Sequence, residues 1–344
     1  MLKQFIVPVI AGQNLSREEA REAMQVIMSG QASEAQIGAF LTALRMKGEV
    51  SAEVTGFADT MRAHAAPISC RRSHLIDTCG TGGDGKGTFN ISTTVAFVLA
   101  GAGLSVAKHG NRGVSSSCGS ADLLAELGIN IDLPSHAVAK AIDEVGVGFL
   151  YAPLFHGAMK HAAKPRRELG FRTVFNILGP LTNPAKAECQ LMGVYDSSLT
   201  CKVAEAMLAL GVRRAMVVHS LDGLDEISTA APTLVSEVRD GEVKSYQLDP
   251  ADFGFKKAPA DAYLGGTPAE NAIITREILQ GASGAKRDIV LVNAAAALVV
   301  GGMAGDFNEG IQLAITSIDS GVALNKLEEL KRFSNSFEGE SLLS

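Results

Sequence analysis

The sequence predicts an α/β protein with a small N-terminal helical subdomain and a larger α/β domain. The larger domain has a mostly parallel central sheet with an antiparallel hairpin at its edge. The first 70 residues carry helix signals and few strand signals, whereas short apolar strands alternate with helices from residue 71 onward. Such alternation is typical of a parallel sheet covered on both faces. Two strand-like runs also flank Asp240-Gly241, a dipeptide typical of tight hairpin turns.

Three helices are predicted within residues 1–70. Ser16 with Glu19, and Ser33 with Gln36, have the spacing of a capping box at a helix start. The apolar side chains that follow recur at helical spacing: Ile37, Phe40, Leu41 and Leu44, then Val54, Phe57 and Met61. These apolar faces could close the subdomain's own core or contact a second copy of the chain, because sequence rarely separates core from interface.

The α/β domain is predicted to span residues 71–344. Its parallel strands are expected at Leu75–Cys79, Leu104–Ala107, Val147–Tyr151, Gln190–Val194 and Ala215–His219. Helices intervene, for example Ala137–Val145 and Leu199–Leu210, and the edge hairpin consists of Thr233–Arg239 and Glu242–Leu248. Thr267 and Glu270 form another capping box that opens a helical C-terminal part, and Ser334–Ser344 is expected to be a frayed tail.

The composition limits the classes of partner. The chain has 344 residues, 47% of them hydrophobic, and a net charge of −6, so it has no general attraction to nucleic acid or anionic membrane. Its five cysteines include no C-x-x-C pair, which favours reduced thiols and makes structural zinc unlikely. No signal peptide and no apolar run of membrane-spanning length is recognisable. We therefore expect a soluble cytoplasmic protein.

The candidate functional centre is the stretch Leu75–Thr94, LIDTCGTGGDGKGTFNISTT. A buried strand is followed by five glycines within eight residues, and a helix then opens at Asn90 and Ser92, both good N-cap residues. Glycines let the backbone approach a phosphate closely, and a helix N-terminus favours negative charge. The stretch therefore predicts a phosphate site.

Two familiar phosphate motifs nearly fit this stretch. Gly80, Gly82 and Gly85 match the dinucleotide fingerprint, but the next strand runs into Lys108–Arg112 (KHGNR) instead of an acidic residue for a ribose. The P-loop motif fails as well, because Gly87 stands where a serine or threonine should bind magnesium. An NAD-dependent enzyme and a P-loop nucleotidase are both disfavoured.

The succession of motifs resembles the anthranilate phosphoribosyltransferase family. It comprises Gly80–Asp84 (GTGGD), Asn90–Thr93 (NIST), Lys108–Arg112 (KHGNR), Arg172–Pro180 (RTVFNILGP) and Asp222–Glu226 (DGLDE). The resemblance covers nearly the whole chain, and the motifs together are highly specific. It implies transfer of the 5-phosphoribosyl group from phosphoribosyl diphosphate to the amine of anthranilate, with Mg²⁺, as the second step of tryptophan biosynthesis from chorismate. It further implies a homodimer formed through the helical part.

The resemblance also implies how the domains are connected. The basic, helix-like segment around residues 158–185 is inserted within the α/β region, and in the family such a segment returns to the helical subdomain. The active site then lies in the cleft between the two parts, which is where small-molecule sites are usually found.

The residues implied to bind phosphoribosyl diphosphate lie in three groups. They are Gly80, Gly83, Asp84, Thr88, Asn90, Ile91, Ser92 and Thr93; Lys108, His109, Gly110, Asn111, Arg112, Gly113, Val114, Ser115 and Ser116; and Ser120. Among them Lys108 is expected to stabilise the pyrophosphate leaving group, as a point cation on a flexible stem. The sequence departs from the family pattern at two positions. Gly113 stands where serine is common, and Ser117 stands where lysine is common. The missing lysine lowers the positive charge near the diphosphate.

A magnesium site is predicted at Asp225 and Glu226. These adjacent carboxylates follow the strand Ala215–His219, and carboxylates at the carboxyl end of a strand are suitable hard ligands beside substrate phosphates. An exposed acidic loop is the ordinary alternative, and it would be preferred without the neighbouring phosphate site. The resemblance implies Ser92 as a third magnesium contact.

Anthranilate is expected to meet Gly80, Asn111 and one arginine. Arg166 and Arg167 are adjacent, and either could bind the carboxylate in bidentate fashion. Alignment with the family favours Arg166, but helical spacing does not separate the two. No residue is assigned as general acid or base, because an aromatic amine loses its proton easily once the new bond forms.

Two rival functions remain on the same architecture. A pyrimidine nucleoside phosphorylase would need a pyrimidine-reading set in place of KHGNR and would have little use for Asp225-Glu226. A non-catalytic nucleic-acid-binding relative is disfavoured by the acidic composition.

Overall fold

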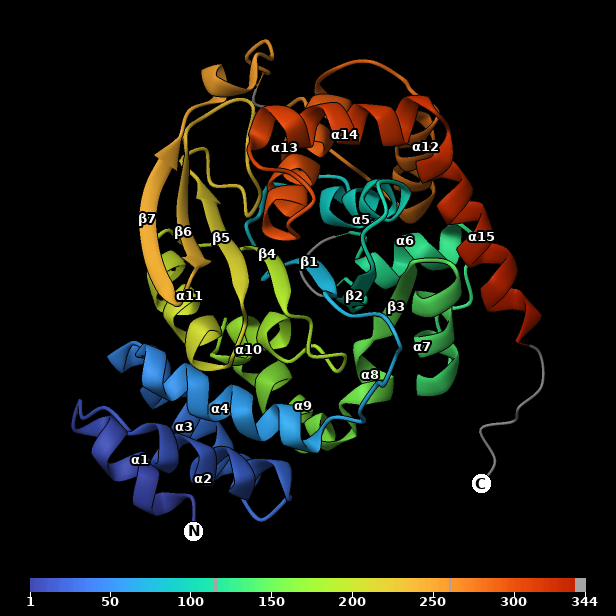
Figure 1. Ribbon diagram of the computed structural model, residues 1–344. Coiled ribbons are helices and arrows are strands. Elements are labelled where there is room, and N and C mark those ends of the chain that lie inside the picture. Colours follow the sequence, from blue (N-terminus) through green and yellow to red (C-terminus); the bar gives the residue numbers. More distant parts are fainter. Residues whose placement is uncertain (114–116, 260, 338–344) are drawn as a thin grey trace.

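The computed structural model describes residues 1–113, 117–259 and 261–337. It confirms the predicted fold class, with an N-terminal group of helices beside a larger α/β part (Figure 1). The N-terminal helices are α1 (Lys3–Ile10), α2 (Arg17–Met28), α3 (Glu34–Lys47) and α4 (Ser51–His64). None of the described helices is long and apolar enough to cross a membrane.

The two capping boxes predicted in this region are confirmed. Ser16 with Glu19 opens α2, and Ser33 with Gln36 opens α3, each by a reciprocal pair of side-chain and backbone hydrogen bonds. The apolar residues predicted to share a face are buried in one core: Ile37, Phe40, Leu41, Leu44, Val54, Phe57 and Met61.

The sheet has seven strands in the order β3-β2-β1-β4-β5-β6-β7. Strands β1 to β5 are parallel, and β6 and β7 add antiparallel to the edge of β5. The bounds are β1 (Ile76–Gly80), β2 (Val106–Gly110), β3 (Val147–Tyr151), β4 (Cys189–Gly193), β5 (Arg214–Ser220), β6 (Thr233–Arg239) and β7 (Glu242–Leu248). The predicted hairpin is confirmed, and both Asp240 and Gly241 have positive φ values, 53° and 80°, as its tight turn requires.

Strand β2 begins and ends later than predicted. The sequence predicts Leu104–Ala107, followed by a basic loop, but Lys108, His109 and Gly110 belong to the strand. They pair in register with Phe149, Leu150 and Tyr151 of β3. The prediction was wrong because polar side chains suggested a loop, whereas the lysine is held in the strand by a buried hydrogen bond to β1.

Helices cover both faces of the sheet, and successive strand residues point to opposite faces. Leu191 and Met216 pack in the core shared with α5, α13 and α14, whereas Met192 and Val217 pack in the core shared with the N-terminal helices, α10 and α11. The helices of the α/β part are α5 (Ile91–Gly101), α6 (Ser120–Glu126), α7 (Ser135–Glu144), α11 (Leu199–Ala209), η2 (Pro250–Phe253), α12 (Pro268–Leu279), α13 (Ala285–Val300), α14 (Phe307–Asp319) and α15 (Val322–Ser336).

The basic segment after β3 forms four short helices that contact the N-terminal group. They are α8 (Ala152–Phe155), η1 (Gly157–Met159), α9 (Lys160–Leu169) and α10 (Phe175–Leu181). Lys164 on α9 forms an ion pair of 2.6 Å with Glu34 on α3, and Arg62 on α4 donates to the Leu181 carbonyl at 2.7 Å. This segment therefore joins the two parts of the molecule.

The first residues of the expected frayed tail are helical. Ser334 to Ser336 still belong to α15, and the Ser334 hydroxyl accepts a hydrogen bond of 3.0 Å from the Asn130 backbone. Because this contact buries Ser334 completely, the helix continues to Ser336. The remaining residues of the predicted tail, 338–344, lie outside the described part of the chain.

Candidate active site

The glycine loop, residues 80–88, begins at the carboxyl end of β1 in the middle of the sheet. Gly83 has a φ of +75°, a left-handed backbone conformation that favours glycine. At Gly80 the requirement is space, because a Cβ there would collide with the carboxylate of Asp225. The loop therefore needs glycine both for its turn and for the close approach of an acidic side chain.

Helix α5 starts directly after the glycine loop, with Asn90 at the predicted N-cap position. The Asn90 side chain does not cap the helix, because its amide donates to the Cys118 carbonyl at 3.1 Å and accepts from Asn271 at 2.9 Å. Ile91 and Thr93, both implied ligand contacts, are buried. The start of α5 thus carries no side-chain cap from Asn90, as an anion-binding helix start requires.

Lys108 lies on the same face of the sheet as α5. Its side chain is 3% exposed, and Nζ donates to the Thr78 carbonyl at 2.5 Å and to Oγ of Ser92 at 3.5 Å. A buried ammonium group with this arrangement is a fixed positive charge directly below the N-terminus of α5. The structure thus brings Lys108 and Ser92 together.

Three half-buried carboxylates lie near one another, Asp84, Asp225 and Glu226, and Glu226 is also close enough to feel the charge of Lys108. Burial, followed by the neighbouring Asp84 carboxylate, raises the pKa of Asp225 to about 7. Burial, followed by the charge of Asp225, raises the pKa of Glu226 well above its usual value, although Lys108 opposes this. The cluster has more negative charge than the single lysine can balance, and this excess opposes ionisation.

The donor set fits a magnesium ion. Oδ2 of Asp84 is buried and has no hydrogen-bond partner among the described residues, although Oδ1 accepts from the Lys86 backbone at 3.1 Å. Carboxylate oxygens without a hydrogen-bond donor are hard ligands of the kind that magnesium prefers. Within the described ranges, no group of three or more His, Cys, Asp and Glu side chains could hold a metal ion by itself. A metal here would therefore share its coordination with a hydroxyl, water or substrate phosphates.

The end of the KHGNR motif folds back onto the start of α6. The Asn111 carbonyl accepts hydrogen bonds from the Ser120 hydroxyl at 3.2 Å and from the Ala121 backbone at 3.1 Å. Asp122, in the first turn of this helix, accepts from the Gly113 backbone at 2.8 Å and from Arg112 at 2.9 Å. The acidic residue in the first turn of α6 was the available signal for this role.

Val114, Ser115 and Ser116, which belong to the predicted donor set, lie outside the described residues. Ser117, one of the departures from the family pattern, donates a hydrogen bond of 2.7 Å to the Gly266 carbonyl.

The His109 side chain lies on the opposite face of the sheet from Lys108. Its ring pairs with His156, at 5.1 Å between ring centroids, and burial lowers the pKa of His109 to about 3. Burial likewise lowers the pKa of His156 to about 4. Alternation along β2 separates the two side chains, so the structure does not bring the His109 ring to the glycine loop.

Arg166 and Arg167 differ in their surroundings. The Arg166 guanidinium lies 4.9 Å from the centroid of the Phe175 ring, and burial lowers its pKa from the ordinary arginine value. It forms no ion pair with any described residue, whereas Arg167 is exposed to solvent. A desolvated arginine without a carboxylate partner is suited to binding a carboxylate ligand.

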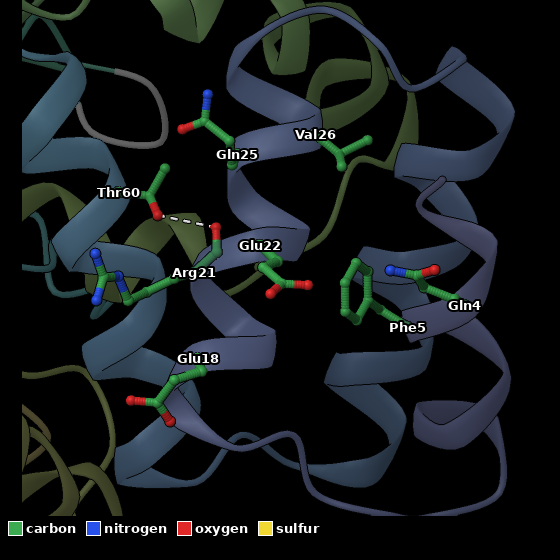
Figure 2. A pocket seen from close by; sticks show the side chains of 8 residues that line it. All are labelled: Gln4, Phe5, Glu18, Arg21, Glu22, Gln25, Val26 and Thr60. Carbon is green, nitrogen blue, oxygen red and sulfur yellow. Dashed lines mark hydrogen bonds between the residues drawn. The ribbon is translucent and has the colours of Figure 1, made fainter.

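A large pocket lies elsewhere, among the N-terminal helices. It has a volume of about 520 Å³ and is lined by Gln4, Phe5, Glu18, Arg21, Glu22, Gln25, Val26 and Thr60. Figure 2 shows these side chains on α1, α2 and α4, with the Thr60 hydroxyl donating to the Arg21 carbonyl at 3.0 Å. None of the predicted site residues lines it.

The chain matches two family models. The helical bundle domain of the glycosyl transferase family matches residues 3–65, and the a/b domain of the same family matches residues 72–324. Among its relatives, the anthranilate phosphoribosyltransferase of Moorella thermoacetica is 56% identical, and the match covers 96% of this chain and 97% of that protein.

Solved structures agree with these matches. The anthranilate phosphoribosyltransferase of Thermus thermophilus is 43% identical, with a TM-score of 0.91 over 96% of this chain and 99% of the other. The enzyme of Saccharomyces cerevisiae in complex with phosphoribosyl diphosphate and Mg is 31% identical, with a TM-score of 0.90 over 97% of this chain and 98% of the other.

Proposed function

The chain belongs to the anthranilate phosphoribosyltransferase family, and on this premise we propose that its active site lies where the glycine loop, Lys108 and the Asp225-Glu226 pair meet. The enzyme transfers the 5-phosphoribosyl group from phosphoribosyl diphosphate to the amine of anthranilate. The products are N-(5-phosphoribosyl)anthranilate and pyrophosphate, in the second step of tryptophan biosynthesis from chorismate. The observation that carries the site assignment is the contact of Lys108 with Ser92 at the N-terminus of α5, beside the three carboxylates.

We propose that the donor phosphates bind between the glycine loop, the first turn of α5 and the KHGNR motif. One side of this binding site combines backbone groups with side chains. It consists of the backbone of Gly80, Gly83, Ile91 and Thr93 and the side chains of Asp84, Thr88, Asn90 and Ser92. Lys108, the backbone of His109, the residues from Gly110 to Gly113 and Ser120 form the other side. Val114, Ser115 and Ser116 belong to the same proposed set and lie outside the described residues. Backbone amides at a helix start and a buried ammonium group together favour a polyanion.

Ser92, Asp225 and Glu226 are proposed to hold Mg²⁺. The ion would supply positive charge to the diphosphate as it leaves, and the yeast enzyme's complex with phosphoribosyl diphosphate and Mg supports this choice. The raised pKa values of Asp225 and Glu226 support it too, because a cation would offset the burial of these charges and their repulsion by neighbouring carboxylates.

Lys108 contributes to catalysis through a fixed positive charge. As the bond between the sugar carbon and pyrophosphate breaks, negative charge grows on the leaving group, and an ammonium group held in a buried position stabilises that charge without reorganising. The hydrogen bond to Thr78 keeps Nζ at this place before the reaction begins. The glycine loop and the acceptor side chains align the two reactants.

Arg166 is proposed to bind the anthranilate carboxylate, with Gly80 and Asn111 nearby in the acceptor site. Replacing Arg166 by alanine is expected to raise the KM for anthranilate roughly a hundredfold and to change the KM for phosphoribosyl diphosphate much less. The physical reason is the loss of a bidentate, charge-assisted contact that only the acceptor makes. Steady-state kinetics with each substrate varied in turn checks this. If Arg167→Ala has the effect and Arg166→Ala does not, the assignment belongs to the neighbouring residue.

The test of the function is an omission experiment that follows anthranilate fluorescence. Anthranilate is expected to be consumed only when the protein, phosphoribosyl diphosphate and magnesium are all present. No consumption by folded protein would contradict the proposal. Pyrimidine nucleoside with phosphate, and DNA binding without turnover, would then be measured as the rival activities.

We further propose a homodimer in the cytoplasm. Three large apolar side chains on the N-terminal helices, Val7, Ile10 and Met46, are 57%, 69% and 84% exposed, which supports a contact with a second copy there. No disulfide joins the five cysteines, which supports a reducing compartment.

We propose that the chain is divided into a helical subdomain, residues 1–70 with the returning segment 158–185, and an α/β domain, residues 71–344. The ion pair of Lys164 with Glu34 supports the returning segment.

A further inference from the structure

Arg172 lies where the acceptor-side segment meets the glycine loop. Helix α9 ends at Gly170, which has a left-handed φ of +65° and turns the chain. Two residues later, the Arg172 guanidinium stacks on the ring of Tyr195, 4.4 Å from its centroid, and Nη2 donates to the Gly83 carbonyl. Arg172 forms no ion pair in the described part of the chain, so no carboxylate there holds its side chain in place.

Tyr195 ties this arginine to a second point of the same loop. It follows strand β4, the direct neighbour of β1, and its backbone N–H donates to Oγ1 of Thr81 at 3.0 Å. Thr81 and Gly83 are two residues apart in the glycine loop. We call Arg172, Tyr195, Thr81 and Gly83 the Arg172 clamp, because the first two residues hold the loop through the last two.

The contact with Gly83 fixes the direction of a backbone donor. In a trans peptide, the carbonyl of one residue and the N–H of the next point in opposite directions. By binding the Gly83 carbonyl, Arg172 therefore turns the Asp84 N–H to the other side of the loop. That N–H has no hydrogen-bond partner among the described residues. It is a backbone donor available to an anionic ligand.

We propose that Arg172 is a positioning residue that holds the glycine loop in the conformation that accepts phosphoribosyl diphosphate. The inference rests on the proposed donor site. Arg172 acts through the loop backbone and the Tyr195 ring, and its charge is not required to touch the diphosphate. Arg166, the proposed ligand of the anthranilate carboxylate, precedes Arg172 by six residues on the same segment. The clamp therefore also connects the anthranilate site to the glycine loop.

The first experiment separates positioning from direct charge. Arg172→Ala is expected to raise the KM for phosphoribosyl diphosphate about tenfold, with kcat and the KM for anthranilate changing much less. Arg172→Gln keeps an N–H donor for the Gly83 carbonyl without a charge, and Arg172→Lys keeps both donor and charge without the planar stacking group. If Arg172 acts by positioning the loop, both variants have a KM for phosphoribosyl diphosphate between the values of the wild type and of Arg172→Ala. The KM of Arg172→Gln is then no higher than that of Arg172→Lys.

The second experiment is a double-mutant cycle with Tyr195. Tyr195→Ala is expected to raise the same KM, and Tyr195→Phe, which keeps the ring, is expected to raise it less. Combining Arg172→Ala with Tyr195→Ala is expected to be little worse than either change alone, because both break one clamp. Calorimetric binding of phosphoribosyl diphosphate with magnesium gives the same comparison without turnover.

Several outcomes would overturn the inference. Full recovery by Arg172→Lys with none by Arg172→Gln would assign Arg172 to the charge of the diphosphate. If Arg172→Ala and Tyr195→Ala raised the KM for phosphoribosyl diphosphate independently, so that their effects added in the double variant, Tyr195 would not be part of the clamp. Arg239→Ala, an exposed arginine on the edge hairpin, is the matched control. An inactive wild type would refute the proposed function, whereas an active wild type with an unaffected Arg172→Ala variant would refute the clamp alone.

Discussion

The Asp225→Asn, Glu226→Gln double variant is expected to lose magnesium-dependent turnover roughly a thousandfold while it remains folded. Both replacements keep the shape of the side chain, and asparagine can still accept the Gly82 backbone hydrogen bond of 2.9 Å that Asp225 accepts. They remove the charge that a divalent cation needs. They also remove two buried charges, which burial and then the neighbouring carboxylates disfavour, as the raised pKa values of both groups indicate. The melting temperature without ligand is therefore expected to stay the same or rise.

Two measurements check this expectation. Turnover is measured across a magnesium titration, and thermal unfolding is measured with and without magnesium plus phosphoribosyl diphosphate. Ligands that bind only the folded state raise the melting temperature, and the double variant is expected to lose this rise. The matched control is Asp240→Asn with Glu242→Gln on the edge hairpin, where the two carboxylates are 91% and 67% exposed. A normal magnesium response in the Asp225, Glu226 variant would remove both residues from the metal site.

The Lys108→Met variant is expected to lower kcat roughly a hundredfold, with the anthranilate KM nearly unchanged. Methionine fills the space of the lysine stem, so the loss isolates the ammonium group. This change also leaves the Thr78 carbonyl without its buried donor and takes the cation away from the carboxylates, so it should lower stability by about 1–3 kcal/mol. The two variants thus shift stability in different directions.

Steady-state kinetics and urea unfolding test the lysine variant. The kinetic defect should appear with the donor saturating, because the charge acts on the departing pyrophosphate. A defect confined to the anthranilate KM would contradict the assignment of Lys108. The Arg239→Ala variant again gives the reference for removing a cation outside the site.

Most of the fold could be predicted because local signals agreed with the final packing. Capping boxes, the Asp240-Gly241 turn and the alternation of strands and helices all act over a few residues. Helix α1 was missed because it has no side-chain cap and contains Pro8. Strand β2 was placed too early because the buried partner of Lys108 lies on another strand.

The site was predictable as a set of motifs but not as a set of contacts. The glycine loop, Lys108 and the carboxylate pair stand out by residue type and spacing. Asn271 does not, and although Arg172 begins a family motif, its contact with Gly83 was not predictable. Each of the two acts on a loop residue far away in the chain, Asn90 and Gly83 respectively. Contacts over such separations leave no periodic pattern in one sequence.

The shared core of the N-terminal helices has a consequence for synthesis on the ribosome. Phe40 and Phe57 pack in the same core as Phe175 on α10 and Val238 on β6. Domains generally fold as units as the chain emerges, N-terminal part first. Here the first helices leave the ribosome long before the residues that complete their core have been translated. Phe40 and Phe57 can pack on each other early, with 6.0 Å between their ring centroids, but the core that they belong to is complete only when about two thirds of the protein has been made.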